Sequence, residues 1–205
     1  YLQQLCLMIL NNANSQYSTS SSPIYGILFD GAWLWEEYLW TILKDAKFGD
    51  KKFEHPTNKD RKGGIRLFDN SLDPEDSSFK KCFRRIYPDF YCENSREDSN
   101  DGIILDAKYK RLENGLVRDD LYQIISYMHT MKIQTGGFIY PVASNTLNNR
   151  ESAGNVVLDT YCLANNTGII KIFGFVIPQN AREYTSFCKE MQKYELSLLL
   201  QFSKI

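Results

Sequence analysis

Two short stretches decide the fold of this chain: RIYPDFY at residues 85–91 and GIILDAK at residues 102–108. The pattern predicts a strand that carries one carboxylate, a polar turn, and an apolar strand that ends in Asp-x-Lys. Because side chains alternate along a strand, Asp106 and Lys108 are expected on the same face. If the two strands pair in a hairpin, the carboxylate of Asp89 meets that of Asp106. We therefore expect two acids and a lysine at one edge of a sheet.

This set of side chains has a chemical meaning. Mg²⁺ prefers oxygen ligands and uses one or two protein carboxylates together with waters and substrate phosphate. The bound metal orients and activates a water and stabilises the charge that builds on the phosphate. Lys108 is expected to hold that water or the scissile phosphate as a compact cation. The pattern predicts a nuclease that uses Mg²⁺, with Mn²⁺ as a substitute.

The Asp-x-Lys pattern carries little weight alone, because it occurs four times in the chain. Asp45, Asp50 and Asp60 begin the other three copies, in a charged region where a solvated surface explains them. Only Asp106 closes an apolar run, and only it follows the Pro-Asp pair at Asp89. A strand end with ordinary surface charges remains the alternative interpretation.

Residues 119–128 predict a helix with acids in its first turn, where they complement the helix dipole. Gln123 and Tyr127 are four residues apart and therefore share one face of it. On a helix beside the Asp106 strand, this polar pair could reach a DNA phosphate or brace Lys108. The alternative is a half-buried tyrosine and a solvated glutamine without a function.

Residues 29–43 predict an aromatic amphipathic helix with Asp30 as its N-cap. Carboxylates inside such a helix need a partner when they are buried. Glu36 could complete the metal site or contact its water, whereas Glu37 is expected to face solvent. An exposed stripe that contains both glutamates is the alternative.

The order of these motifs resembles the PD-(D/E)xK nuclease superfamily. The residues within and around these motifs resemble more closely the McrC family, the nuclease subunits of McrBC modification-dependent restriction systems, over roughly residues 25–142. Four stretches carry this resemblance: LFD at 28–30, LWE at 34–36, ILDAKYK at 104–110 and DLYQ at 120–123.

The resemblance implies an α/β fold with a restriction-endonuclease-like core, in which helices flank a mixed central sheet. It also implies the roles of the site residues. The implied metal ligands are Asp89, Asp106 and Glu36, and the implied catalytic set adds Lys108, Gln123 and Tyr127. The implied partners are DNA and an AAA+ GTPase of the McrB type, which recognises 5-methylcytosine DNA while this chain cuts it.

Two other functions are compatible with the sequence. The chain could be a different PD-(D/E)xK enzyme, such as a DNA repair nuclease or a junction resolvase. It could also be a catalytically silent scaffold that docks an AAA+ motor. The intact set of Asp89, Asp106 and Lys108 argues against a silent scaffold.

Composition and length complete the expectations. The 205 residues, 43% of them hydrophobic, suit one globular domain. We expect a linker helix and loop at 1–24, following a further N-terminal region, and the nuclease domain at 25–205. The five cysteines lack a CxxC pair, which disfavours zinc and suits a reducing cytoplasm, and no run is long enough to span a membrane. The net charge of -1 provides no global attraction for DNA.

The remaining pattern predicts scaffold. The expected elements are a helix at 1–10, a loop at 11–23, strands at 51–56, 65–68 and 136–142, a long turn at 93–101, a loop at 145–152, a hairpin of 156–164 and 169–177, and a closing helix at 181–202.

Overall fold

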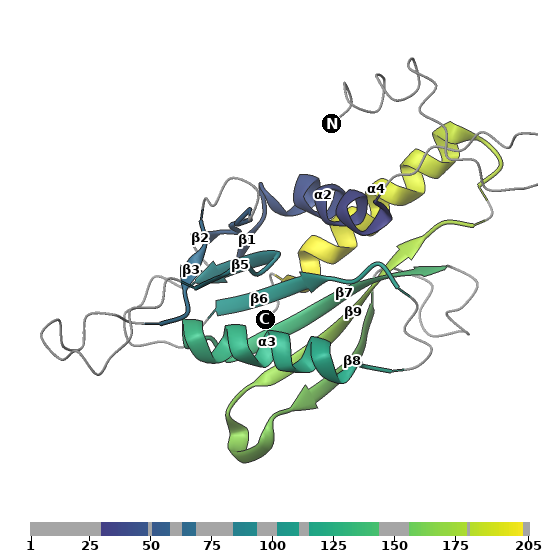
Figure 1. Cartoon of the computed structure of the whole chain (residues 1–205). Coiled ribbons are helices and arrows are strands. Elements are labelled where there is room, and N and C mark those ends of the chain that lie inside the picture. Colours follow the sequence, from purple (N-terminus) through teal and green to yellow (C-terminus); the bar gives the residue numbers. More distant parts are fainter. Residues whose placement is uncertain are drawn as a thin grey trace, which may run out of the picture.

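The centre of the protein is a five-stranded mixed sheet (Figure 1). The computed structural model describes residues 30–48, 51–57, 63–68, 84–93, 102–110, 115–143, 156–179 and 181–202. The strand order is β5-β6-β7-β9-β8. The bounds of these strands are β5 Phe90–Glu93, β6 Gly102–Ala107, β7 Thr135–Ala143, β9 Ile169–Ile177 and β8 Val156–Cys162. The inner strands β6, β7 and β9 are parallel, and the outer strands β5 and β8 run antiparallel to their neighbours. The predicted mixed central sheet is therefore confirmed.

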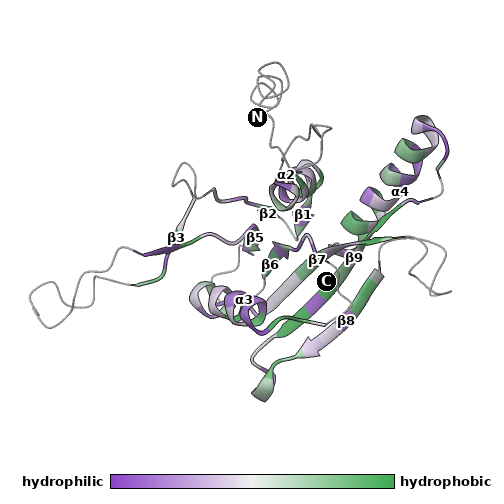
Figure 2. Cartoon of the chain, turned by 45° about the vertical axis from the view of Figure 1, so that its right-hand side comes forward, coloured by the Kyte–Doolittle hydropathy of each residue, from purple (hydrophilic) through white to green (hydrophobic). Residues whose placement is uncertain are grey.

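Three helices cover the two faces of this sheet (Figure 1). Helices α2 (Gly31–Leu43) and α4 (Tyr184–Phe202) pack on one face, and α3 (Arg118–Met131) packs on the other. Helix α3 also supplies the crossover that the parallel pair β6 and β7 requires. Figure 2 shows hydrophobic residues concentrated in the central strands, while the helices carry mixed faces. Two apolar cores thus fix the helices on opposite sides of β6.

Local sequence signals set the helix ends. The Asp30 side chain accepts hydrogen bonds from the backbone N–H groups of Ala32 (3.0 Å) and Trp33 (3.1 Å), which confirms the predicted N-cap of α2. Helix α3 ends at Lys132, whose φ of 56° lies in the left-handed region. The close packing of α3 on β7 depends on Gly136, where a Cβ would come within 2.7 Å of the Met128 sulfur.

The predicted strand at 85–91 is wrong as a continuous element. It is divided between β4 (Arg85–Ile86), which pairs with β3 (Ile65–Arg66), and β5, which begins at Phe90. Pro88 lies at the break and has no N–H to donate to a ladder, so it favours an interruption there.

The strands predicted at 51–56 and 65–68 are much shorter than expected. Residues Lys51–Lys52 form β2, which pairs with β1 (Lys47–Phe48), and a single bridge joins Glu54 to Tyr91. The bridge places the segment around Glu54 along the outer edge of β5, so this edge is covered by backbone pairing.

The other predicted elements are confirmed where the structure describes them. Strands β8 and β9 form the expected antiparallel pair around a short 3-10 helix, Ala164–Asn166, and α4 is the closing helix. The predictions for 1–10, 11–23, 145–152 and most of 93–101 lie outside the described residues. Among the helices described, none is long and apolar enough to cross a membrane.

Candidate active site

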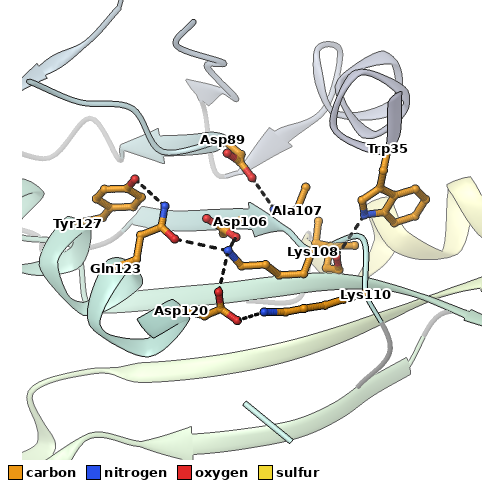
Figure 3. A network of polar contacts seen from close by, with 10 residues as sticks. Trp35, Asp89, Asp106, Ala107, Lys108, Lys110, Asp120, Gln123 and Tyr127 are labelled. Carbon is orange, nitrogen blue, oxygen red and sulfur yellow. Dashed lines mark hydrogen bonds and ion pairs between the residues drawn. The ribbon is translucent and has the colours of Figure 1, made fainter. Parts of the chain in front are cut away.

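The register of the β5–β6 hairpin brings the two predicted acids together. Phe90 pairs with Leu105, so the same register continued by one residue places Asp89 opposite Asp106. The Oδ2 atom of Asp89 accepts a hydrogen bond of 2.7 Å from the backbone N–H of Ala107 (Figure 3). The hairpin pairing expected from the sequence therefore positions both carboxylates at one end of the two strands.

Both carboxylates are held in an environment that disfavours their charge. Burial, then the neighbouring carboxylates of Asp106 and Glu36, raise the pKa of Asp89 well above its usual range. Burial also raises the pKa of Asp106, which is only 3% exposed, although Lys108 opposes this effect. Acids that repel each other in a desolvated site gain stability from a cation placed between or beside them.

Lys108 supplies one such cation. Its ammonium lies 2.6 Å from Oδ2 of Asp106, 3.2 Å from Oδ1 of Asp120 and 3.4 Å from the side-chain oxygen of Gln123 (Figure 3). Burial alone would lower the pKa of Lys108, but the carboxylates of Asp106 and Asp120 outweigh it and raise that pKa. The ammonium is therefore charged and confined by contacts from both β6 and α3.

Asp120 belongs to this network, which the sequence interpretation missed. Its carboxylate binds the ammonium groups of both Lys108 and Lys110, and these two lysines lower its pKa against the opposing effect of burial. From the sequence, Asp120 was expected to complement the dipole of α3 and belonged to the DLYQ stretch of the resemblance, but it was given no role at the site. Its contact with Lys108 crosses from a helix to the end of a strand, and local periodicity carries no signal for such a contact.

Gln123 and Tyr127 share one face of α3, as their spacing predicts. The side-chain N–H of Gln123 donates a 2.9 Å hydrogen bond to the Tyr127 hydroxyl, while its oxygen accepts from Lys108. Tyr127 is 9% exposed, so it is a buried anchor for the glutamine amide. The contact of Gln123 with Lys108 is the bracing arrangement expected for this pair, although Gln123 itself stays exposed.

A second tyrosine, Tyr140, is close enough to this network to feel the charges of Asp120, Lys108 and Asp106. The Tyr140 hydroxyl is buried and has no hydrogen-bond partner within the described part of the chain. Burial, followed by the carboxylate of Asp120, raises the pKa of Tyr140 to about 12. Its sequence position inside an apolar strand gave no sign of this proximity.

Helix α2 is tied to the same end of the sheet. The indole N–H of Trp35 donates to the backbone carbonyl of Ile139 at 3.4 Å, and the same carbonyl accepts the backbone N–H of Lys108 at 3.0 Å (Figure 3). Glu36 follows directly on the helix. Burial raises its pKa, and the nearby Asp106 carboxylate adds to this effect. The anchored tryptophan thus sets where the glutamate can lie.

The carboxylate of Glu36 faces a histidine that the sequence interpretation did not select. Nε2 of His55 lies 3.7 Å from Glu36 and 4.0 Å from Glu37. The side chain of Glu36 is 32% exposed to solvent and that of Glu37 is 42% exposed. The sequence around His55, Lys-Lys-Phe-Glu-His-Pro at 51–56, carries no pattern that indicates this contact.

The donor set fits a magnesium ion held by two carboxylates. Within the described ranges, no three histidine, cysteine, aspartate or glutamate side chains form a group that could hold a metal ion. Mg²⁺ needs one or two protein carboxylates when waters and phosphate complete its shell. Asp89 and Asp106 meet this requirement, since they are adjacent and desolvated. Glu36 does not form a three-acid metal-binding group with them in the described part of the chain.

The fold and the site define a class: a mixed α/β protein with two acids and a lysine converging at an edge of its sheet. A family model described as "McrBC 5-methylcytosine restriction system component" matches residues 1–141, a span that holds all six predicted site residues. The chain belongs to this McrBC family.

The chain is similar to one in a structure titled "Refined half-complex from tetradecameric assembly of Thermococcus gammatolerans McrB AAA+ hexamers with bound McrC". The sequence identity is 15% and the TM-score is 0.49. The likeness covers 85% of this chain and 34% of that one, so this chain spans about a third of its length. No curated protein matches this chain.

Proposed function

We propose that this chain is a Mg²⁺-dependent DNA endonuclease with a PD-(D/E)xK core, the cutting component of a 5-methylcytosine-dependent restriction complex. The convergence of Asp89, Asp106 and Lys108 at the β5–β6 edge carries the proposal. Membership of the McrBC family supplies the restriction context. Mn²⁺ is expected to substitute for Mg²⁺, because it shares the preference for oxygen ligands.

Each side chain of the site has a role in this proposal. Asp89 and Asp106 would hold the metal, which when bound polarises the scissile phosphate and supplies an activated water. Lys108 donates to the attacking water or to a phosphate oxygen, and its confinement by Asp120 and Gln123 keeps the ammonium in place for this contact. The positive charge of Lys108 then offsets the negative charge that develops during cleavage.

The partners follow from the same proposal. The net charge of -1 gives this chain no long-range attraction for DNA, so we expect it to bind DNA weakly by itself. An AAA+ GTPase of the McrB type would recognise the modified DNA and deliver it. Lys108 and Lys110 lie beside each other at Asp120, and they are the cations placed to contact the delivered backbone.

Calorimetric titration with Mn²⁺ tests the metal site. Wild type should bind saturably, and Asp106→Asn should bind at least tenfold more weakly, because it removes one of two carboxylate ligands. Asp159→Asn is the matched control, since Asp159 lies on β8 at the far edge of the sheet and should leave the affinity unchanged. Folded wild-type protein that binds no Mn²⁺, with or without an oligonucleotide, would favour the silent scaffold.

Cleavage assays separate the remaining alternatives. With the GTPase and GTP present, wild type should cut DNA that contains 5-methylcytosine and leave unmethylated DNA intact, whereas Asp106→Asn should cut neither. Cutting of both DNAs without the GTPase would instead indicate a repair nuclease or a junction resolvase. A scaffold would show the same binding to the GTPase in wild type and variant, and no cleavage in either.

A further inference from the structure

His55 contacts the backbone of Asp89, the residue directly before β5. Its side chain is 6% exposed and packs beside the stacked rings of Trp40 and Phe90, with a centroid distance of 5.2 Å to each. The preceding residue, Glu54, exchanges backbone hydrogen bonds of 2.8 and 3.0 Å with Tyr91 on β5. Backbone pairing and two aromatic contacts therefore fix the position of the imidazole.

The two ring nitrogens face different groups. Nδ1 lies 2.6 Å from the backbone carbonyl oxygen of Asp89. Because a carbonyl oxygen can only accept, Nδ1 carries the hydrogen and donates it. Nε2 points toward α2, at 3.7 Å from the carboxylate of Glu36 and 4.0 Å from that of Glu37. One buried side chain thus connects the backbone of a proposed metal ligand with the glutamates of α2.

The backbone of Asp89 needs such a connection. Strand β5 begins only at Phe90, so the carbonyl of Asp89 lies outside the ladder with β6. Asp89 is held at two points in the described structure: its Oδ2 accepts from the N–H of Ala107, and its carbonyl accepts from His55. The residue before it, Pro88, has no N–H to contribute. Among the described residues, the His55 bond is thus the contact that holds the backbone carbonyl of Asp89, beside the bond made by its carboxylate.

We infer that His55 is a positioning residue that orients Asp89 for metal binding through its Nδ1–H. The inference rests on the proposed function, because it assumes that Asp89 holds the metal. It differs from a packing role, since Phe or Leu would fill the space beside the two aromatic rings as well as histidine does. The hydrogen bond and not the ring is what the metal site requires.

Three substitutions at position 55 separate the hydrogen bond from the packing. In His55→Asn, the side-chain N–H reaches the position that Nδ1 occupies in wild type. In His55→Gln, the side-chain N–H reaches toward the position of Nε2. His55→Phe keeps an aromatic ring but has neither nitrogen. The Mn²⁺ affinity of each protein is measured by calorimetry, and its free energy of unfolding by urea titration. Trp40→Phe is the packing control, because it alters the contact with the imidazole and leaves both nitrogens in place.

The variants are expected to differ in their Mn²⁺ affinity. His55→Asn should keep Mn²⁺ affinity within about threefold of wild type, whereas His55→Gln and His55→Phe should lose about tenfold or more. Trp40→Phe should lower stability with unchanged affinity. If His55→Phe fails to fold, the comparison of His55→Asn with His55→Gln still decides whether the Nδ1 hydrogen bond sets the Mn²⁺ affinity, because both variants carry amides of similar polarity.

Two results overturn the inference, and they differ from failure of the proposed function. Wild-type affinity in His55→Gln, or equal losses in His55→Asn and His55→Gln, would show that the Nδ1 bond to Asp89 does not set metal affinity. In both cases wild type and the Asp159→Asn control bind Mn²⁺ normally. Absence of binding in wild type itself would instead remove the proposed metal site, and with it the role assigned to His55.

Discussion

Replacing Lys108 with methionine should destabilise the metal-free protein and make its stability depend strongly on pH. Methionine fills much of the space of the lysine stem but removes the ammonium that lies 2.6 Å from Asp106. Asp120 keeps a second cation, Lys110, so its charge stays paired. Asp106 has no such replacement among the described residues, and it is left desolvated beside Asp89.

The size of the loss follows from the burial of the pair. Asp106 is 3% exposed and the Lys108 side chain 15%, so the contact is closer to a buried ion pair than to a surface one. Removal of one partner of a buried pair costs about 3–5 kcal/mol. Asp106 limits this cost by taking up a proton, which for an ordinary aspartate at neutral pH requires about 4 kcal/mol. We expect a loss of about 2–4 kcal/mol in the free energy of unfolding at neutral pH.

The pH dependence has a definite sign. Burial raises the pKa of Asp106 and Lys108 lowers it, so removal of Lys108 raises it further. The folded variant then binds a proton that its unfolded chain releases, and its stability falls as pH rises through the raised pKa of Asp106. Urea titrations in EDTA should therefore show a larger difference between wild type and Lys108→Met at about pH 8 than at about pH 5.

Lys110→Met is the matched control. Lys110 contacts the same Asp120 carboxylate, but its side chain is 40% exposed, so we expect a change below about 1 kcal/mol. Equal losses in the two variants, or a loss in Lys108→Met that stays constant between the two pH values, would refute the argument. Either outcome would mean that Asp106 is not kept charged by Lys108.

Two further substitutions test the packing of α3 and the new member of the network. Gly136→Ala should lower the free energy of unfolding by about 1–3 kcal/mol, because the added Cβ would come within 2.7 Å of the Met128 sulfur, and a urea midpoint equal to wild type would contradict this. Asp120→Asn should slow DNA cleavage about tenfold with little loss of stability, because Lys108 loses one of its three contacts. Rates measured beside the Asp159→Asn control, expected near wild type, check the second prediction, which fails if Asp120→Asn cuts as fast as wild type.

Local periodicity predicted several parts of the site correctly. The two-residue alternation of a strand placed Asp106 and Lys108 on one face, and the four-residue spacing of a helix did the same for Gln123 and Tyr127. The capping role of Asp30 followed from its side chain alone. These features depend on neighbours within one turn of helix or a few residues of strand, and a sequence states such neighbours directly.

The predicted strand at 85–91 shows where this approach failed. Its apolar residues satisfied a strand pattern, but the structure assigns its two ends to different sheets and leaves Asp89 just outside β5. Because of that break, the carbonyl of Asp89 is free of the ladder and accepts a hydrogen bond from His55, which lies 34 residues earlier in the chain. The interruption at Pro88 was visible in the sequence, but its consequence for the site was not.

The sequence by itself determined the main helices and central strands, the alternation that pairs an acid with a lysine, and the resemblance to McrBC proteins that the family match then confirmed. Only the tertiary structure decided which side chains surround that pair. Asp120 reaches Lys108 because α3 packs across β6, and His55 reaches Asp89 because a bridge at Glu54 covers the edge of β5. Both contacts join segments whose separation along the chain carries no periodic signal, since long-range packing, and not local conformation, brings them together.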